Sequence, residues 1–283
     1  MSRDVLPVPD HVVDKVLRLA LEEDLGRAGD ITTNAVIPQE QYSHGKIVAR
    51  GAGTIAGLAA ATRVFATLDP RVEVVIHVDE GAAVEAGSVL ADVNGPTRAM
   101  LTGERTCLNL VGHLSGIATK TATMQAAVEG TNARIVDTRK TLPGLRALEK
   151  YAVRAGGGAN HRFGLDDSVL IKDNHIAALG SIEAAVLAAK AKVGHPVKIE
   201  LEVDTLEQLE VALEIGVDVV LLDNMGPETL RKAVAMVDGR CLTEASGGVT
   251  IETVRSVAET GVDLIAVGAL THSAPQLDIG LDM

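Results

Sequence analysis

Short apolar segments alternate with longer amphipathic segments from about residue 133 onward, and this alternation strongly limits the possible folds. The apolar segments are rich in β-branched residues, as strands are, and lie at 133–138, 168–172, 197–203, 217–223, 240–245 and 262–268. The segments between them have the apolar spacing of helices. Strands and helices that alternate in this way form a parallel sheet with crossover helices. Because no GxGxxG follows a strand, we expect a closed or nearly closed α/β barrel, with GANHRFG (158–164) as a candidate for a seventh strand.

The first half of the chain has a different pattern. Residues 10–25 fit a helix with Asp10 as its N-cap and Gly26 just beyond its end. Short Val- and Ile-rich runs with glycine turns follow between about 44 and 98, and residues 100–128 fit one long helix or two. We therefore predict three parts: a β-rich, sandwich-like N-terminal α/β domain over 1–115 with a helix leading into the barrel, an α/β barrel domain over 116–272, and a C-terminal tail over 273–283.

The charge and composition of the chain argue against several classes of protein. With 26 basic against 38 acidic residues the net charge is -12, which argues against binding to nucleic acid or to an anionic membrane. No run approaches the roughly 20 apolar residues of a membrane helix, and the acidic N-terminus does not have the form of a signal peptide. Cys107 and Cys241 have no CxxC or metal-type spacing, so we expect neither a disulfide framework nor a structural zinc. We expect a cytoplasmic protein.

Two adjacent cations, Arg139 and Lys140, follow the first predicted barrel strand in the stretch IVDTRKTLPGLR. Active sites of α/β barrels gather where the strands run into the following loops. Other residues recur at the corresponding ends of later strands: Lys172, Glu202, Asp223, Ser246 and Gly268. The strand ends therefore predict one site built from several βα units.

Cations are concentrated between residues 134 and 172, where eight lysines and arginines stand against four acidic residues. This excess predicts a pocket for a multiply anionic ligand. The alternative is a set of solvated helix faces, and it applies best to Arg146, Lys150 and Arg154, which are spaced four residues apart. His161 and Arg162 follow three glycines that allow a close approach to a ligand, although a lone histidine is as often a packed or surface residue.

The strand VKIELEV alternates between charged and apolar residues, so Lys198, Glu200 and Glu202 share one face and should point into the barrel. Buried carboxylates require a partner, and Lys198 and Glu200 are candidates for an internal ion pair. Glu202, nearest the strand end, is the better candidate for a ligand contact, and Asp223 has the equivalent place on the next strand. The next predicted strand (240–245) is followed by SGG (246–248), which is either a tight turn or a set of backbone amides that bind phosphate.

Six blocks of the sequence closely resemble the quinolinate phosphoribosyltransferase family, also called nicotinate-nucleotide pyrophosphorylase. They are DTRKTLPGLR, YAVRAGGGANHRFGLDDSVLIKDNH, IELEV, LLDN, EASGG and VGALTHS, and GERTCLNLVGHLSGIAT resembles the family segment before the barrel. The resemblance implies an N-terminal α/β domain, a seven-stranded barrel, and a homodimer or a higher oligomer with shared sites. It also implies that quinolinate and phosphoribosyl pyrophosphate yield nicotinate mononucleotide, pyrophosphate and CO2, with Mg²⁺ as cofactor, in de novo NAD biosynthesis.

The resemblance also implies roles for individual residues. It places five residues around quinolinate, with the first contributed by the neighbouring subunit: Arg105, Arg139, His161, Arg162 and Lys172. Lys140 would lie near phosphoribosyl pyrophosphate, and Glu202 and Asp223 would hold ribose hydroxyls and help to place a Mg²⁺ bound mainly by the pyrophosphate. The 5-phosphate would meet backbone amides of Ser246, Gly247, Gly248, Gly268 and Ala269, and Thr138 and Val267 complete the predicted substrate-binding set. The predicted catalytic residues are Lys140, Lys172, Glu202 and Asp223.

Two other functions compete with this one. A related enzyme acting on nicotinate would need fewer cations than Arg105, Arg139, Arg162 and Lys172 supply, because nicotinate carries one carboxylate. A biotinyl or lipoyl carrier domain is suggested by VDEGAAVEAGSVLADVNG, but such domains carry a lysine in the turn between their hairpins. Residues 72–101 contain no lysine, which argues against a carrier.

Overall fold

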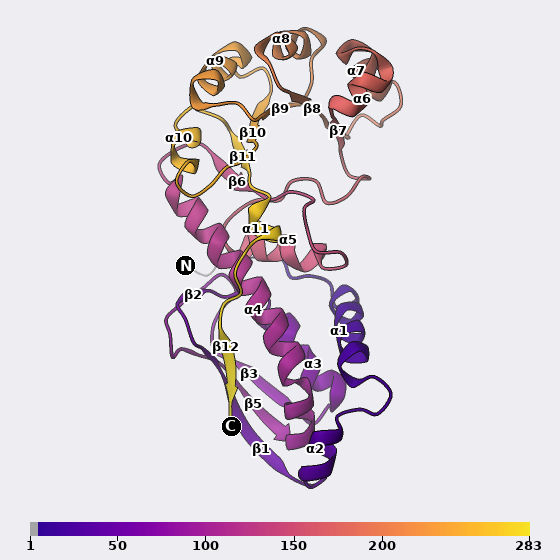
Figure 1. Ribbon diagram of the computed structural model, residues 1–283, viewed down its shortest axis with the longest axis vertical. Coiled ribbons are helices and arrows are strands. Elements are labelled where there is room, and N and C mark those ends of the chain that lie inside the picture. Colours follow the sequence, from indigo (N-terminus) through magenta and orange to yellow (C-terminus); the bar gives the residue numbers. More distant parts are fainter. Residues whose placement is uncertain (1–4) are drawn as a thin grey trace. The chain divides into compact units, whose positions relative to one another are not determined.

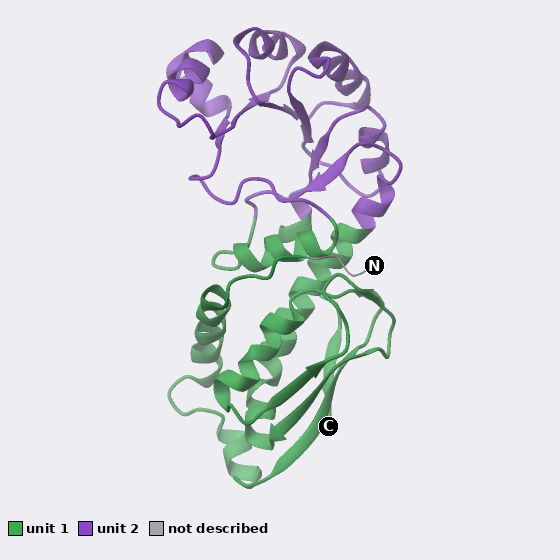
Figure 2. Cartoon of the chain, turned by 180° about the vertical axis from the view of Figure 1, so that it is seen from behind, with its two compact units in different colours: residues 1–122, 141–157, 270–283 green, residues 123–140, 158–269 purple. Residues whose placement is uncertain are grey.

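The computed structural model describes residues 5–283, which form two compact units. The first unit contains the chain up to Ala122 together with Thr141–Gly157 and Leu270–Met283, and the second contains Thr123–Lys140 and Gly158–Ala269 (Figure 2). These units are not continuous in sequence, unlike the domains predicted with boundaries at 115/116 and 272/273. None of the helices in the described part of the chain is long and apolar enough to cross a membrane.

The first unit is built on a four-stranded sheet in the order β12-β1-β5-β3. β1 (Tyr42–Ala49) lies between β5 (Val89–Pro96) and β12 (Ile279–Asp282), β3 (Glu73–Ile76) is the other edge, and all pairs are antiparallel. Ile47 of β1 and Ala91 of β5 are fully buried, so this sheet has an apolar face. The remaining elements of the unit are α1 (Asp10–Leu25), α2 (Ile31–Val36), β2 (Gly53–Thr54), α3 (Leu58–Leu68), β4 (Ala83–Val84), α5 (Arg146–Ala155) and most of α4 (Thr97–Ala127) (Figure 1).

The C-terminal residues belong to this sheet rather than forming a tail. The chain reaches it by passing close to α4, where Gly112 and Gly116 leave room for backbone. A Cβ at Gly116 would lie 2.0 Å from the carbonyl oxygen of Pro275, and a Cβ at Gly112 would lie 2.9 Å from that of Leu277. Only glycine permits so close an approach. Of the two alternatives for residues 100–128, one long helix or two, the structure has the single helix, while α1 has Pro9 rather than Asp10 as its N-cap.

The second unit is a six-stranded parallel sheet in the order β6-β11-β10-β9-β8-β7. Its strands are β6 (Arg134–Val136), β7 (Val169–Ile171), β8 (Ile199–Val203), β9 (Val219–Asp223), β10 (Leu242–Ser246) and β11 (Leu264–Ala266). Its helices are α6 (Asp173–Leu179), α7 (Ile182–Lys190), α8 (Leu206–Ile215), α9 (Pro227–Val237) and α10 (Val254–Ala258), while α11 (Ala269–His272) begins at the last residue of this unit and continues in the first. The strands curve around a common centre with α6 to α10 outside them (Figure 1), so the predicted fold class is confirmed.

The predicted seventh strand is reduced to one parallel bridge between Val136 and Ala159. Ala159 donates its N–H to Ile135 and accepts one from Asp137. The pairing stops there because the next two residues turn to the Asp137 side chain: Asn160 donates through Nδ2 at 2.6 Å and His161 through its backbone N–H at 2.9 Å. The described sheet therefore has six regular strands rather than seven.

Two aspartates at the starts of strands fix the register of the sheet. Asp218 accepts the backbone N–H of Ile199 at 2.7 Å, and Asp263 accepts that of Thr243 at 2.8 Å. Both follow a Gly-Val pair at the start of a predicted strand. These bonds hold the amino ends of the strands in line, so the residues that terminate them lie together at the opposite edge.

Candidate active site

A pocket of about 410 Å³ lies at the carboxyl ends of the six strands of the second unit. Nine of the predicted site residues line it: Thr138, Arg139, Lys140, His161, Arg162, Lys172, Glu202, Asp223 and Ser246. Leu170, Leu221, Glu244 and Ala266 complete the lining. The structure thus brings together the strand-end residues on which the sequence argument rested.

The first feature of the pocket is a pair of half-buried arginines, Arg139 and Arg162. The Nε atoms of Arg139 and Arg162 are buried and have no hydrogen-bond partner in the described part of the chain. Burial lowers the pKa of Arg162, and the like charge of Arg139 lowers it further, while the carboxylate of Glu200 acts in the opposite direction. Two buried donors that repel each other favour an anion between or beside them, since it would satisfy both.

The second feature is the ion pair between Lys172, which follows β7, and Glu202 of β8. Lys172 is also the N-cap of α6, and the ring of His175 accepts its backbone N–H at 3.0 Å. Asp223, at the end of the neighbouring strand β9, accepts a hydrogen bond of 2.6 Å from the side chain of Asn224. Alternation along β8 places Glu202 on the face predicted for it, two residues from Glu200.

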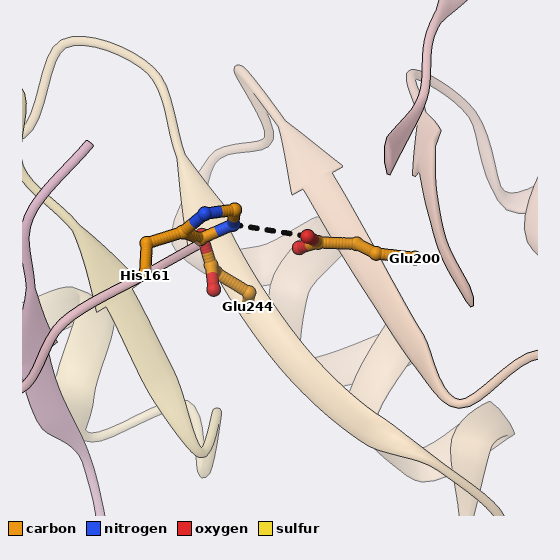
Figure 3. A group of neighbouring side chains, drawn as sticks. All are labelled: His161, Glu200 and Glu244. Atoms are coloured by element: carbon orange, nitrogen blue, oxygen red, sulfur yellow. Dashed lines mark ion pairs between the residues drawn. The ribbon is translucent and has the colours of Figure 1, made fainter. Parts of the chain in front are cut away.

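The third feature is a cluster of His161, Glu200 and Glu244 (Figure 3). Each residue contributes one potential metal ligand, a ring nitrogen or a carboxylate oxygen, and these atoms all lie within 4.8 Å of one another. The Nε2 atom of His161 is 2.9 Å from Glu200 and 3.5 Å from Glu244. Lys198, which the sequence suggested as the ion-pair partner of Glu200, is exposed. The Lys198–Glu200 ion pair is therefore wrong, and the buried carboxylate of Glu200 is paired with an imidazole instead.

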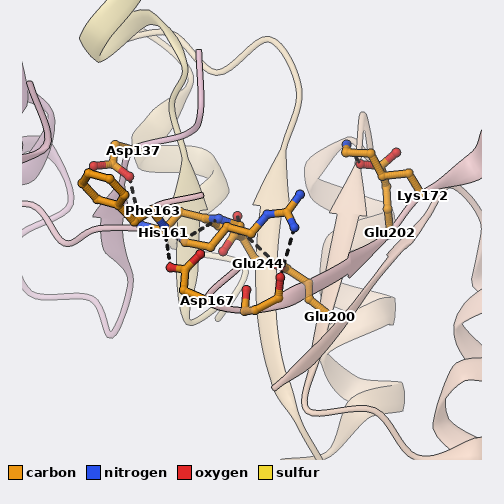
Figure 4. A network of polar contacts seen from close by, with 10 residues as sticks. Asp137, His161, Phe163, Asp167, Lys172, Glu200, Glu202 and Glu244 are labelled. Atoms are coloured by element: carbon orange, nitrogen blue, oxygen red, sulfur yellow. Dashed lines mark hydrogen bonds and ion pairs between the residues drawn. The ribbon is translucent and has the colours of Figure 1, made fainter. Parts of the chain in front are cut away.

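The loop that carries His161 and Arg162 is held by carboxylates (Figure 4). Asp137, which is fully buried, accepts hydrogen bonds from Asn160 and from the backbone of His161. Asp167 accepts the backbone N–H groups of Phe163 and Gly164 at 2.5 and 2.9 Å. These bonds give an otherwise irregular segment a defined path past the pocket.

The glycines after β10 have a packing requirement of their own. Gly247 has φ +98°, and a Cβ there would lie 2.1 Å from the side-chain oxygen of Asn224. This favours the tight-turn interpretation for Gly247, whereas Gly248, at φ +61°, has open space around its Cβ position. The helix that follows these glycines, α10, begins only at Val254.

The remaining predicted residues have more varied environments. Val267 is buried and donates its amide N–H to Val136 at 3.0 Å, so that amide is not available to a phosphate. Gly268 and Ala269 follow at the start of α11. Arg105 lies exposed on α4, in the first unit. Their predicted roles stay predictions.

The cations of helix α5 fit neither of the two interpretations given for them, an anion-binding pocket or a solvated helix face. Lys150 is 2% exposed and is therefore not on a solvated face. Arg146 donates to Thr141 at 3.0 Å and Arg154 donates to the carbonyl of Leu6 at 3.1 Å. All three lie in the first unit, where they serve packing and local hydrogen bonding.

Four polar residues that support the pocket were not predicted in that role from the sequence: Asp137, Asn160, Glu200 as the partner of His161, and Glu244. Two of them left a signal. Glu200 and Glu244 lie two residues before Glu202 and Ser246, so each shares the inward face of its strand with a predicted site residue. A charged residue at such a position in an apolar strand requires a buried partner.

A parallel α/β sheet with cations and carboxylates gathered in a pocket at the carboxyl ends of its strands defines an enzyme class that acts on anionic substrates. Two family models match the chain: the quinolinate phosphoribosyl transferase N-terminal domain over residues 30–115 and its C-terminal domain over residues 117–282. The chain belongs to the quinolinate phosphoribosyl transferase family, and the resemblance noted from the sequence is confirmed.

Individual relatives agree with this assignment. The chain is 46% identical over 269 residues to the probable nicotinate-nucleotide pyrophosphorylase [carboxylating] of Bacillus subtilis (strain 168), covering 95% of this chain and 92% of the relative. It is 49% identical over 274 residues to the nicotinate-nucleotide pyrophosphorylase [carboxylating] of Mycobacterium leprae (strain TN), covering 94% and 95%. Among solved structures, NadC from Streptococcus pyogenes superposes with a TM-score of 0.94 at 38% identity and covers 98% of both chains.

Proposed function

We propose that this protein is the enzyme its family describes, which converts quinolinate and phosphoribosyl pyrophosphate to nicotinate mononucleotide, pyrophosphate and CO2 in NAD biosynthesis. Family membership along nearly the whole chain supports the reaction. The observation that carries the assignment to this pocket is the pair of buried, unpartnered Nε donors of Arg139 and Arg162. Quinolinate has two carboxylates to offer such donors, and nicotinate has one.

Quinolinate binding falls to the cationic side of the pocket. Arg139 and Arg162 would each gain a charge-assisted hydrogen bond that the substrate-free pocket does not provide. Lys172 would contact the substrate by sharing its ammonium group between Glu202 and a substrate carboxylate. Holding both carboxylates fixes the plane of the ring and therefore the direction of its nitrogen lone pair.

Phosphoribosyl pyrophosphate would occupy the side of the pocket lined by Lys140, Glu202 and Asp223. The two carboxylates suit ribose hydroxyls, and their oxygen atoms also suit Mg²⁺, which prefers oxygen ligands and often bridges substrate phosphates. We place Mg²⁺ mainly on the pyrophosphate, with Glu202 and Asp223 as candidate ligands. When bound, it would neutralise charge on the leaving group.

The chemistry then follows in two stages. The ring nitrogen forms a bond to the anomeric carbon as the bond to pyrophosphate breaks, and the developing positive charge on the ribose resembles that in glycoside cleavage. The nitrogen of the product is cationic, so the electron pair left at C2 by departing CO2 is stabilised until C2 takes up a proton. The arginines hold the ring during both stages.

The assembly is also part of this proposal. We place Arg105 in the quinolinate site of the neighbouring subunit of a homodimer, because the family resemblance assigns it there. Its exposure on α4 leaves it available to a second chain. The cytoplasmic location also stays a prediction.

A direct assay tests the reaction. Purified protein is mixed with phosphoribosyl pyrophosphate, Mg²⁺ and quinolinate carrying a label on the C2 carboxyl group, and labelled CO2 is collected. Nicotinate replaces quinolinate in a parallel reaction. We expect nicotinate mononucleotide and CO2 from quinolinate in equal amounts, and no mononucleotide from nicotinate. Product from nicotinate at a comparable rate would favour the competing nicotinate enzyme.

A further inference from the structure

Both ring nitrogens of His161 are engaged inside the protein. The backbone N–H of Arg162 donates to Nδ1 at 2.8 Å, so Nδ1 presents a lone pair and carries no proton. The single proton of the neutral ring is then on Nε2, which faces Glu200 at 2.9 Å and Glu244 at 3.5 Å (Figure 3). This geometry assigns His161 the uncharged Nε2–H tautomer.

The same tautomer argues against a metal at this cluster. One imidazole and two carboxylates form a ligand set that divalent cations accept. A metal on Nε2 would need the lone pair there, and the ring proton would have to move to Nδ1. It would then point at the N–H of Arg162, and two donors would face each other. The hydrogen bond to Nδ1 is therefore compatible with a hydrogen-bonded cluster only.

The two carboxylates present a difficulty for an anionic substrate. Glu200 is 5% exposed and Glu244 is 2% exposed, so water screens neither charge well. His161 and Glu244 line the pocket that we assign to quinolinate, whereas Glu200 does not. The ring of His161 thus lies at the pocket wall, and its Nε2–H group faces Glu200.

We propose that His161 is a positioning residue that masks the carboxylate of Glu200 from the dianionic substrate, rather than a cation that binds it. The proposal rests on the proposed function for the identity of the substrate. A neutral ring adds no charge to recognition of a dicarboxylate, which leaves that task to Arg139, Arg162 and Lys172. Two contacts of the ring serve this role. The Nε2–H group donates to Glu200 and partly neutralises its charge, and Nδ1 accepts the backbone N–H of Arg162, which holds the ring in place.

The first test reads the tautomer without any substrate. Protein labelled with ¹⁵N in the histidine rings is studied by NMR, and the His161 signals are assigned as those lost in His161→Gln. We expect one protonated nitrogen at Nε2 and one unprotonated nitrogen at Nδ1. A doubly protonated ring, or a proton on Nδ1, would overturn the proposal, and this result does not depend on which reaction the enzyme catalyses.

The second test is a double-mutant cycle on quinolinate binding. KM for quinolinate and kcat are measured at saturating phosphoribosyl pyrophosphate for the wild type, His161→Ala, Glu200→Gln and the double variant. Unmasking a buried carboxylate should raise KM about ten- to hundredfold in His161→Ala. Removal of that charge in the double variant should recover about tenfold or more of the loss. A double variant that is no better than His161→Ala would show that the loss does not come from the charge of Glu200, and the proposal fails.

A matched pair separates masking from general electrostatics. Arg139→Ala and Arg139→Ala/Glu200→Gln are measured in the same way, because any loss of negative charge helps an anion to bind. If Glu200→Gln lowered KM for quinolinate by the same factor in the Arg139→Ala background as in the His161→Ala background, a specific role for His161 would be refuted. His161→Gln, whose uncharged amide still donates to Glu200, should lose less than His161→Ala and provides the comparison if the alanine variant does not fold. A wild type that does not bind quinolinate would refute the proposed function instead.

Discussion

Replacement of Arg139 by alanine should nearly abolish turnover while leaving the fold intact. Arg139 follows strand β6 and lines the pocket, and its buried Nε has no partner in the described chain. The side chain therefore supports no other part of the protein through that atom. Its removal also takes away the like charge that lowers the pKa of Arg162, so the pKa of Arg162 should move back toward its usual range.

The size of the effect follows from the contacts that the substrate would lose. A hydrogen bond involving a charged group is worth about 1.5–3 kcal/mol, and a carboxylate left buried without its partner costs more. Truncation of one member of a buried charge pair typically costs about 2–5 kcal/mol. A loss of about 3 kcal/mol corresponds to roughly two orders of magnitude in kcat/KM, and we expect at least that loss.

Arg134→Ala is the matched control, because Arg134 is exposed at the opposite end of the same strand. Steady-state assays that vary quinolinate and phosphoribosyl pyrophosphate separately give the two kcat/KM values, and thermal unfolding checks the fold. A surface substitution of this kind should change the free energy of unfolding by no more than about 0.5 kcal/mol. If Arg139→Ala retained near-normal kcat and KM, or lost no more activity than Arg134→Ala, the assignment of the anion site would be refuted.

Three other perturbations test different parts of the molecule. Glu202→Gln and Asp223→Asn remove charge at constant size and should weaken binding of phosphoribosyl pyrophosphate and Mg²⁺ in titrations while leaving quinolinate affinity nearly intact; the reverse pattern would assign these carboxylates elsewhere. Random co-expression of Arg105→Ala with Lys172→Ala should give roughly a quarter of wild-type activity, because half the dimers are mixed and each has one intact site; activity at the level of the single variants would contradict a shared site. Burial raises the pKa of Glu80, so the folded state binds the proton of this carboxyl group more tightly than the unfolded chain does. Protonation of Glu80 therefore stabilises the folded state at low pH, and this contribution is lost as pH rises above about 4.5. In urea unfolding, the stability advantage of the wild type over Glu80→Gln should therefore shrink between pH 4 and pH 7, and an advantage that grows would show the opposite sign of the shift.

The sequence predicted the parallel sheet and the pocket well because both depend on local pattern. A buried parallel strand is a short apolar run, and the residue that ends it lies at the edge where the site forms. Arg139, Glu202 and Asp223 could be found in this way without knowledge of any neighbour. The strand β12 could not, since its four residues carry little pattern and its place beside β1 depends on Gly112 and Gly116, more than a hundred residues earlier.

Partners of buried polar groups were the hardest feature to predict, because they are chosen in three dimensions. Alternation along VKIELEV correctly placed Glu200 inside but suggested its neighbour Lys198 as the partner. The structure pairs it with His161, 39 positions away in a loop whose path is set by Asp137. A strand with period two shows which way a side chain faces, but it does not show what it meets there.

The position of Glu200 explains why a pocket for a dianion retains buried acidic groups. Without substrate, Arg139 and Arg162 repel each other in a site where burial already lowers the pKa of Arg162, and the carboxylate of Glu200 offsets part of that effect. With substrate bound, two further negative charges arrive and the same carboxylate would oppose them. A neutral imidazole that donates to Glu200 reconciles the two states, because it reduces the repulsion toward the substrate without adding a cation that would compete for its carboxylates. Glu200 therefore stabilises the charge of Arg162 when no substrate is bound, and the hydrogen bond from His161 weakens the repulsion between Glu200 and the substrate when it is bound.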